Sequence, residues 1–571
     1  MSKVYQGISA STGLAIGPVW LYRPATIQIV RKNNCDPSIE WQRCQSALAK
    51  ANEQLEQLHQ RTSETIGAAE AEIFEAHQMI LSDPDFLETI QTNLNTQTYN
   101  AEIAIQDSVN TYANMLLALD STYFQERAQD VLDIGHRLIH ILMGVPTDSF
   151  ELPEKPVIIL AEDLSPSDTV QFPRNKILGI CTQKGGPTSH TAILSRSLGV
   201  PAAVSVPFDW ETIQNGQMAI LDGAVGSLLL NPSPDQQKTA NQRQTAQQTE
   251  WEHLLKHAAE PANTSDGKTI EVVANIGSAD DARHALTLGA EGVGLLRTEF
   301  LYLNRESMPT EAEQTQVYRE IFEIMGNRPV VVRTLDIGGD KAVPYIGFEE
   351  EANPFLGWRA IRMADNQPDL LRIQFRALLR AASAETDLRI MIPMISNADE
   401  IKMARNLLNQ AKQELQNEKI DTPETVQFGI MVEIPAAAIQ ARELADLVDF
   451  FSIGTNDLTQ YALAVDRTNE RVAHLASPFH PAVLRLIRMT IEGAHVKGKW
   501  VGLCGEMAGD PLAAPVLLGL GLDEFSMAAS SIPGLKETIR QLDSQQCKDV
   551  ANTVCELLTA QDVKAYLQKL L

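Results

Sequence analysis

The sequence lacks the features that mark several classes of protein. None of its apolar runs approaches the roughly 18 residues that a membrane-spanning helix needs, so no membrane insertion is expected. Its six cysteines form no CxxC pair and show no metal-binding spacing, so we expect reduced thiols. The first residues, Met-Ser-Lys-Val-Tyr, do not resemble a secretory signal, and the sequence therefore predicts a cytoplasmic protein.

Basic residues and nucleotide-binding motifs are scarce as well. The chain holds 47 Lys and Arg against 73 Asp and Glu, a formal net charge of −26. Nucleic-acid binding needs a basic face, so this balance argues against it and instead suits a partner that has a basic patch. The sequence contains no GxxxxGK[ST] loop and no strand-linked GxGxxG, so no nucleotide site is recognisable.

The length of the chain indicates several domains, since 571 residues are too many for one hydrophobic core. Residues 1–22 and 145–231 carry short strand-like runs and predict one α/β domain. Apolar residues at spacings of three and four, from Trp41 through Leu55 and onward, predict an all-helical block at 23–144 that is inserted into it. We expect a polar, Gln-rich linker at 232–261.

The C-terminal part, residues 262–571, has a regular pattern of strands and helices. Amphipathic helical stretches separate most of its eight strand candidates, which begin near Glu271, Gly292, Val330, Leu388, Val426, Phe450, Trp500 and Glu524. Eight strands that alternate with helices over about 300 residues are typical of a (β/α)8 barrel. The predicted fold is therefore a multidomain α/β protein that ends in a TIM barrel.

A first candidate site lies in the segment from Lys184 to Pro201, around His190. Gly185 and Gly186 allow a sharp turn, and the helix predicted to follow has these expected features: Thr188 or Ser189 as cap, an apolar face of Ala192, Ile193, Leu194 and Leu198, and Gly199 as its end. The His190 imidazole would then lie at the positive end of a helix, where a phosphoryl group on the ring is stabilised. The competing interpretation is a histidine that only caps or packs.

A second candidate site lies at the C-terminal ends of the barrel strands, where barrel enzymes have their active sites. Polar residues occur at five of these ends: Arg297 and Glu299, Arg333 and Asp336, Glu433, Asn456 and Asp457, and Cys504 and Glu506. A local ion pair or a solvated loop residue would explain any one of them. The whole set is better explained by a shared catalytic site.

The residue types in this set indicate its chemistry. Four arginines suit a small, highly charged oxyanion, because guanidinium groups bind phosphate and carboxylate bidentately; they are Arg297, Arg333, Arg359 and Arg467. Glu433 and Asp457 offer hard oxygen ligands for Mg²⁺. Cys504 is placed to act as a general acid or base, with a packing role as the alternative. A small phosphorylated carboxylic acid is the phosphoryl donor that fits.

Long segments along nearly the whole chain match one known family. They begin at Gly7 (GISASTGLAIG), Glu72 (EIFEAH), Asp163 (DLSPS), Lys184, Leu296 (LRTEF), Arg333 (RTLDIGGDK), Asn353 (NPFLGWRAIR), Gly454 (GTNDLTQYALAVDR) and Leu503 (LCGEMAGD). Through these segments the chain resembles enzyme I of the phosphoenolpyruvate-dependent phosphotransferase system.

The resemblance implies a role for each site residue. His190 would take the phosphoryl group of phosphoenolpyruvate on Nε2 and pass it to a histidine of the small carrier protein HPr. Cys504 would protonate the enolate to pyruvate, and Thr169 would orient the His190 ring. The residues implied to hold phosphoenolpyruvate are Arg297, Arg333, Arg359, Asn456, Asp457 and Arg467, and those implied to ligate Mg²⁺ are Glu433 and Asp457.

The resemblance also implies partners. The helical block would dock HPr, with Glu72, His77, Met79 and Arg127 as candidate contacts, and the barrel would form a homodimer. Since the barrel and the docking block are separate, the His190 domain must swing between them, and the linker is where the hinge is expected.

Pro187 is a departure from the family pattern, because many sugar-branch members have Arg there. This leaves a nitrogen-regulatory enzyme I, acting on an HPr paralogue, as the alternative. That paralogue usually has a further N-terminal sensory domain, which this sequence lacks, so we expect the sugar branch. A phosphoenolpyruvate synthase or pyruvate phosphate dikinase would need an ATP-grasp domain. An inactive docking protein would be expected to have lost His190, Glu433, Asp457 or Cys504, and all four are present.

Overall fold

The protein is described by a computed structural model that forms two compact units, Met1–Gln248 and Thr249–Leu571. The described residues are 2–23, 29–65, 68–118, 122–145, 153–169, 172–186, 189–303, 305, 307–339, 343–347, 351–467, 469 and 471–570. Each unit is considered by itself. Among the described residues, no helix is long and apolar enough to cross a membrane.

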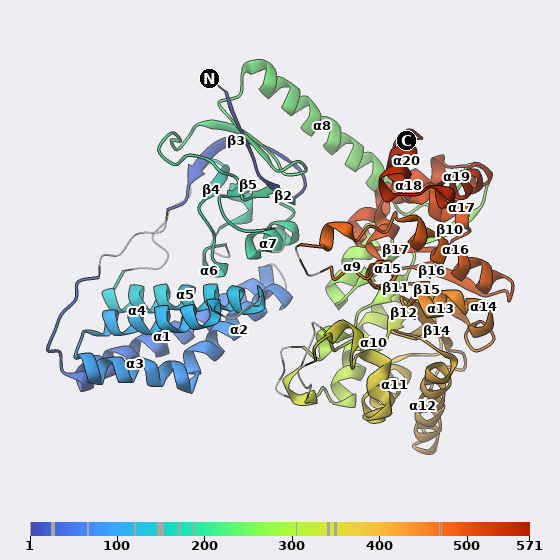
Figure 1. Cartoon of the computed structure of the whole chain (residues 1–571), viewed down its shortest axis with the longest axis horizontal. Coiled ribbons are helices and arrows are strands. Elements are labelled where there is room, and N and C mark those ends of the chain that lie inside the picture. Colours follow the sequence, from blue (N-terminus) through green and yellow to red (C-terminus); the bar gives the residue numbers. More distant parts are fainter. Residues whose placement is uncertain are drawn as a thin grey trace. The chain divides into compact units, whose positions relative to one another are not determined.

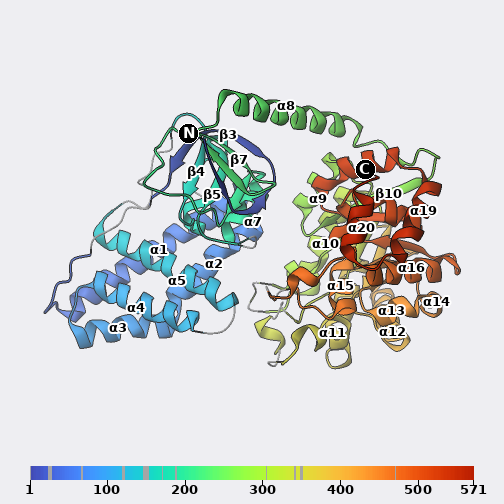
Figure 2. The same cartoon turned by 45° about the horizontal axis from the view of Figure 1, so that its top comes forward.

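The first unit is built on an eight-stranded sheet of order β1-β8-β7-β3-β4-β5-β6-β2 (Figure 2). Its strands are β1 (Lys3–Gln6), β2 (Ile8–Ser11), β3 (Leu14–Leu21), β4 (Val157–Ala161), β5 (Ile177–Thr182), β6 (Ala202–Val204), β7 (Met218–Asp222) and β8 (Ser227–Leu230). β3 and β4 are parallel neighbours, with Val19 opposite Ile158. The helical block therefore leaves the sheet after one strand and returns at the next, which confirms that it is an insertion.

The helical block contains five helices in the described residues, α1 (Pro37–Thr65), α2 (Ala68–Ser82), α3 (Pro84–Gln97), α4 (Ala101–Leu117) and α5 (Thr122–Met143) (Figure 1). Asp83-Pro84, which interrupts the apolar pattern of the block, is the start of α3, and the sequence pattern does not mark α3 as a separate helix. The Asp83 carboxylate accepts hydrogen bonds from the Asp85 and Phe86 N–H groups, while Pro84 occupies the first turn.

The Gln-rich segment after β8, which was expected as a linker, is helical, as α8 (Pro234–His257). Gln and Ala favour helix, which explains why a polar segment with little apolar surface is still ordered. Ala240 is buried against Leu14 and Ile220, and the Gln244 amide donates to the Leu14 carbonyl at 2.9 Å. These contacts attach the first part of α8 to the sheet.

The second unit is a closed barrel of eight parallel strands, as predicted (Figure 1). The strands are β10 (Thr269–Ile276), β11 (Val293–Leu296), β12 (Val330–Arg333), β13 (Leu388–Ile392), β14 (Gln427–Val432), β15 (Phe450–Ile453), β16 (Trp500–Leu503) and β17 (Glu524–Met527). A short strand, β9 (Ala262–Asn263), pairs with β10 from outside.

Helices follow the strands of this barrel. They are α9 (Ala279–Thr287), α10 (Glu311–Met325), α11 (Pro368–Ala381), α12 (Ala398–Asn417), α13 (Pro435–Ile439), α14 (Ala441–Leu444), α15 (Thr455–Leu463), α16 (Pro481–His495), α17 (Ala514–Leu520), α18 (Ile532–Gln541), α19 (Ser544–Glu556) and α20 (Ala560–Leu567). Together with the strands they bury one large apolar core.

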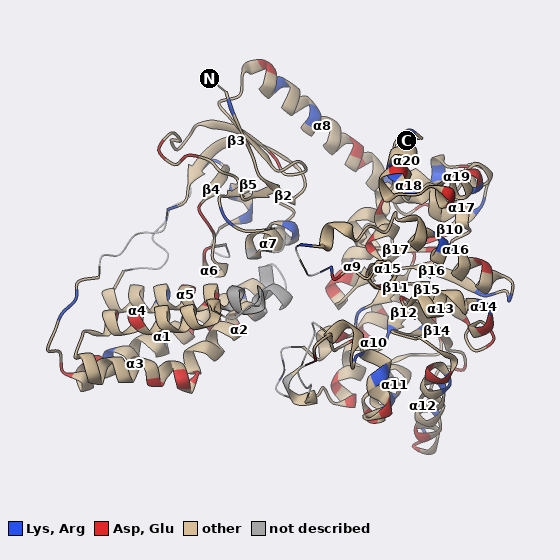
Figure 3. Cartoon of the chain, viewed as in Figure 1, with Lys and Arg blue, Asp and Glu red and all other residues tan. Residues whose placement is uncertain are grey.

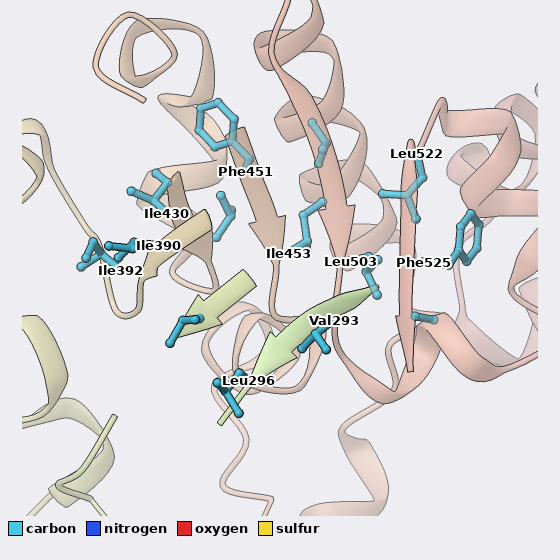
Figure 4. Packing of buried hydrophobic residues seen from close by; sticks show 14 of the residues in the cluster. Val293, Leu296, Ile390, Ile392, Ile430, Phe451, Ile453, Leu503, Leu522 and Phe525 are labelled. Atoms are coloured by element: carbon cyan, nitrogen blue, oxygen red, sulfur yellow. The ribbon is translucent and has the colours of Figure 1, made fainter. Parts of the chain in front are cut away.

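Alternate residues along each strand serve two different cores. Outward-facing side chains such as Val293, Ile390 and Phe451 pack against the helices (Figure 4). The inward-facing set is smaller and consists of Leu295, Val331, Met391, Met431, Phe450 and Cys504. The strand period of two therefore places Cys504 inside the barrel, at the level where strand β16 ends.

An ion-pair network links α10, α11 and α12, which carry both acidic and basic residues (Figure 3). Arg376 is buried and pairs with Glu311 at 2.7 Å, Glu414 at 3.0 Å and Glu418 at 2.8 Å. We expect Arg376→Gln to lower the free energy of unfolding by about 2–3 kcal/mol, because three carboxylates lose their shared cation. Urea titration would measure this, with the exposed Lys402→Gln as control at no more than about 0.5 kcal/mol.

The N-terminal end of the barrel holds a buried carboxyl, Glu524, the first residue of β17. Its side chain is 1% exposed and lies 3.7 Å from the Arg389 guanidinium, which also pairs with Asp387 at 2.9 Å. Burial, and then the charge of Glu271, raise the pKa of Glu524 to about 8. The carboxyl is therefore largely protonated at neutral pH in the folded state.

This raised pKa predicts that the barrel loses stability as the pH rises. The folded state keeps the Glu524 proton up to about pH 8, whereas the unfolded chain releases it near 4.5. The contribution is fully present below pH 4.5 and is lost as the pH rises toward 8 and beyond. Glu524→Gln should remove this dependence and raise the melting temperature more at pH 8.5 than at pH 5.5. An equal change at both pH values would contradict the assignment.

Candidate active site

Two buried arginines share one buried carboxylate at the C-terminal end of the barrel. Asp336 pairs with the Arg333 Nη1 atom at 2.9 Å and accepts from the Arg359 Nε and Nη2 atoms at 2.8 and 3.0 Å. Arg333 ends β12 and also pairs with buried Glu299. Burial opposes the charge of both arginines, but the carboxylates hold their pKa values above the ordinary range. The result is a fixed cationic pair.

Two carboxylates at the ends of neighbouring strands face this pair. Glu433 follows β14, and its Oε1 accepts from the Met394 N–H at 2.6 Å; Met394 has φ of 58°, which turns that N–H toward the carboxylate. Asp457 lies in the first turn of α15 and pairs with Arg359 at 3.1 Å and Arg467 at 3.2 Å. Burial, and then Asp457 and Asp336, raise the pKa of Glu433 to about 8.

This carboxylate pair fits Mg²⁺. Glu433 and Asp457 supply hard oxygens, and Mg²⁺ commonly takes one or two carboxylates together with oxygens of substrate and water. Gly454 lies beside the pair, and a Cβ there would be 3.2 Å from Glu433 Oε2, so glycine keeps space open next to that oxygen. No group of three or more His, Cys, Asp or Glu side chains that could hold a metal occurs in the described residues. A site completed by substrate oxygens agrees with both observations.

Cys504 lies inside the barrel at the end of β16. Its side chain is buried, its N–H donates to the Ile453 carbonyl at 3.0 Å, and its sulfur lies 3.7 Å from the same oxygen. Burial raises the pKa of the thiol to about 11, more than the nearby Arg333 charge lowers it. The thiol is thus protonated at neutral pH, which is the state that an acid requires.

The other predicted site residues of the barrel lie at the same end. Arg297 follows β11 with an exposed side chain, and its N–H donates to the Ile276 carbonyl at 2.9 Å. Asn456 accepts from the Glu506 N–H at 3.4 Å. Arg467 is one-third exposed and pairs with Asp457. Five strand ends, those of β11, β12, β14, β15 and β16, and the loops that carry Arg359 and Arg467 therefore contribute to one site.

The helix predicted around His190 is present as α7 (His190–Leu198). Gly185 has φ of 93° in the preceding turn, and Gly199 ends the helix with φ of 64°. Ser189 is the N-cap residue, as expected, but its side chain makes no capping hydrogen bond. Ile193 is 47% exposed and does not belong to the buried face, which the other predicted members form.

Several predicted residues lie outside the described part. These are the side chains of His190, Thr169, Glu72 and Arg127, and all of Pro187 and Thr188. Among the docking candidates that are described, Met79 is 63% exposed on α2. His77, two residues earlier on α2, is fully buried, 3.4 Å from Asp130, so it offers no surface contact in this structure.

From the sequence, Asp336 is recognisable only as one polar residue at a strand end, and Tyr461 is not predicted as part of the site. The Tyr461 hydroxyl donates to the Phe355 carbonyl at 2.6 Å and accepts from Arg359 Nη1 at 3.4 Å, which ties α15 to the loop that carries Arg359. Both residues lie inside matched segments, RTLDIGGDK and GTNDLTQYALAVDR. Their positions inside these segments could have identified both as site residues, but could not have identified the side chains that they contact.

Comparison with known protein families agrees with this arrangement. Residues 6–127 match the N-terminal domain of phosphoenolpyruvate-utilising enzymes, residues 153–226 match their mobile domain, and residues 252–544 match their phosphoenolpyruvate-binding domain. The barrel site described above lies within the last of these. The fold and the site thus define the class of phosphoenolpyruvate-utilising enzymes.

Individual relatives cover the whole chain. It is 44% identical over 570 residues to the phosphoenolpyruvate-protein phosphotransferase of Bacillus sp. (strain S), covering 99% of this chain and 98% of the relative. The protein of the same name from Bacillus subtilis (strain 168) is 43% identical over 567 residues, covering 99% of both chains. The chain belongs to the phosphoenolpyruvate-protein phosphotransferase family.

Proposed function

We propose that this chain transfers the phosphoryl group of phosphoenolpyruvate to His190 and from there to a histidine of the carrier protein HPr, releasing pyruvate, as the first step of the sugar phosphotransferase system. One observation carries the proposal. At the C-terminal end of the barrel, Arg333 and Arg359 lie beside the Glu433–Asp457 pair and the protonated thiol of Cys504. A small dianionic phosphorylated acid matches this combination of cations, metal-binding oxygens and acid.

Phosphoenolpyruvate would bind through its charged groups. Arg297, Arg333, Arg359, Arg467 and Asn456 are the proposed contacts to its phosphate and carboxylate. Glu433 and Asp457 would hold Mg²⁺, which when bound neutralises charge on the transferring group. Asp336 fixes the two buried guanidinium groups before substrate arrives, so little reorganisation is needed when charge develops.

The transfer itself needs one nucleophile and one acid. A bond forms between His190 Nε2 and phosphorus as the bond between phosphorus and the enol oxygen breaks, and that oxygen keeps the electron pair. Cys504 then gives its proton to C3 of the enolate, which yields pyruvate and leaves a thiolate. The His190 phosphoryl group would be stabilised by the N-terminal end of α7, and Thr169 would orient the ring.

The carrier would dock on the helical block. Met79 supplies exposed apolar surface on α2, and the acidic balance of the chain suits a carrier with a basic rim around its histidine. Glu72 and Arg127 remain proposed contacts. We assign His77 an indirect role, because its buried ring lies under this surface between Asp130 and Asp133.

We also propose that the barrel forms a homodimer. Its helices and loops expose large apolar side chains, among them Ile439, Leu475 and Val496, each more than half exposed. Sedimentation of the full chain over a range of concentrations would show a dimer, and substitution of these residues by Asp should weaken it.

The proposed function is tested by mixing the protein with radiolabelled phosphoenolpyruvate and Mg²⁺, with and without purified HPr. The wild type should take up one acid-labile phosphate per chain and pass it to HPr, whereas His190→Ala should take up none. Equal uptake by His190→Ala, or no uptake by the wild type, would show the mechanism to be wrong. Sugar-branch and nitrogen-branch carriers tested side by side would decide the branch.

A further inference from the structure

A glutamine is buried in the apolar core of the barrel, on helix α11. Gln374 is fully buried on the face of α11 that packs into this core, with Leu371 one turn before it and Leu378 one turn after it. Glutamine is mostly exposed in proteins, because a buried amide loses its hydrogen bonds to water. Methionine or leucine would fill the position without that cost. The amide is therefore expected to have specific partners.

The Gln374 amide has three hydrogen-bond partners, one for its carbonyl and two for its nitrogen. The carbonyl accepts from the Leu335 N–H at 2.9 Å. The nitrogen donates to the Thr298 hydroxyl at 3.0 Å and to the Tyr318 hydroxyl, on α10, at 3.1 Å. Since an unpaired buried amide is costly, these bonds fix both the side chain and the groups that it contacts.

Two of the partners lie just after neighbouring strands, at the end of the barrel that holds the site. Thr298 follows β11, and Leu335 follows β12. Backbone pairing between these strands includes Leu296 opposite Val332, immediately before the two segments. Beyond this pair, the side chain of Gln374 connects the segments to each other.

Both segments carry a carboxylate partner of Arg333. The Arg333 guanidinium pairs with Glu299 and, at 2.9 Å, with Asp336. Glu299 directly follows Thr298 in the chain, and the residue before Asp336 is Leu335. The Thr298 hydroxyl also donates to the Arg333 carbonyl at 2.9 Å. Arg333 is thus held, through its guanidinium and its backbone, by two segments that the same amide fixes.

We propose that Gln374 is a positioning residue for phosphoenolpyruvate, which directs the Arg333 guanidinium by fixing Thr298 and Leu335. This rests on the proposed function, in which Arg333 binds phosphoenolpyruvate. A guanidinium presents its N–H groups in a rigid planar fork, so a small rotation breaks a two-atom contact to phosphate or carboxylate. The two carboxylates keep the guanidinium charged, and the amide keeps the carboxylates in place. Gln374 acts from the core and needs no contact with the substrate.

The test measures phosphoenolpyruvate kinetics in full-length variants with Mg²⁺ and excess HPr. Gln374→Met keeps the length of the side chain and removes the amide, and Thr298→Val keeps the shape and removes the hydroxyl. Each should lower kcat/KM at least about tenfold, mainly by raising KM, because a misdirected Arg333 binds the substrate less well. A variant that only folded less well would contain fewer active molecules, which lowers the rate per chain and leaves KM unchanged.

Tyr318→Phe is the matched control. It removes the third partner of the Gln374 amide, on a helix that carries none of the proposed site residues. Its melting temperature should fall as in the other variants, since one amide N–H loses its partner, but its KM should stay within about twofold of wild type.

Two further variants examine the chain of hydrogen bonds itself. Thr298→Ser keeps the hydroxyl and should restore most of the KM that Thr298→Val loses. The double variant Gln374→Met/Thr298→Val should have a KM within about twofold of the more affected single variant, because both changes break the same connection. Effects that multiply in the double variant would show two independent roles and would contradict the proposed connection.

The outcomes separate this inference from the proposed function. An unchanged KM in either Gln374→Met or Thr298→Val, or an equal rise of KM in Tyr318→Phe, would overturn the positioning role. A wild-type KM in Arg333→Gln would show instead that Arg333 does not bind phosphoenolpyruvate, and the proposed contact would then be wrong together with its positioning. Both are supported when KM rises in Arg333→Gln, Gln374→Met and Thr298→Val while the control keeps its wild-type KM.

Discussion

Cys504→Ala should lose phosphoryl uptake from phosphoenolpyruvate by at least about a hundredfold, the usual contribution of a positioned acid. The buried thiol keeps its proton at neutral pH because its pKa is raised to about 11, and alanine has no proton to give to the enolate. The same variant should still accept phosphate backwards from phospho-HPr, since that step involves His190 alone. Both reactions are measured as acid-labile label on the chain.

Cys181 provides a matched control. It is another buried cysteine whose pKa is raised by burial, but it lies in strand β5 of the first unit. Cys181→Ala should change neither direction of transfer by more than about twofold, apart from a modest stability loss from the small cavity. Equal loss of both directions in Cys504→Ala would count against the proton-donor role and would indicate a structural one.

The outline of the barrel could be predicted because each strand has a recognisable pattern within its own stretch of sequence. Each of the eight starting positions, from Glu271 to Glu524, lies within two residues of a strand in the structure. Buried parallel strands are continuous apolar runs, and the helices between them repeat with a different period. The position of Cys504 at a strand end followed from the same pattern, and so did those of Glu433 and Asp457.

The partners of these residues could not be predicted, because pairing across a barrel depends on where strands end in three dimensions. Arg359 is 23 residues from Asp336 in the chain, yet it forms a two-atom contact with it. The burial of His77 has a similar cause: α2 turns that residue toward Asp130 on α5 and turns Met79 outward. Spacing within one helix does not tell which face a neighbouring helix covers.

Local signals also misled in two places. The Gln-rich start of α8 has the composition of a linker, but it also has good helix propensity and one buried alanine, Ala240. Helix α3 was overlooked because Asp83-Pro84 suggests an end of helix, although the same pair is equally suited to begin one.

Asp336→Asn should lower kcat/KM for phosphoenolpyruvate by about a hundredfold, or about 3 kcal/mol, which is typical when a buried charge pair loses one partner. Asp336 is fully buried and holds Arg333 and Arg359 at once. When residue 336 has no charge, the Arg359 guanidinium keeps Asp457 as its remaining carboxylate partner. A firmer hold of Arg359 on Asp457 would remove an oxygen from the proposed metal pair. The loss should therefore appear in kcat/KM and as a higher Mg²⁺ requirement.

An exposed carboxylate on helix α11 serves as the control. Asp369→Asn removes an exposed partner of Arg372 on α11, at 2.9 Å, and should leave kcat/KM unchanged within about twofold. Transfer from phospho-HPr to His190 should be intact in Asp336→Asn, because no barrel residue takes part in it. A variant that lost this reverse step as well, or whose Mg²⁺ requirement did not move, would show that Asp336 supports the fold of the barrel and does not position the two arginines.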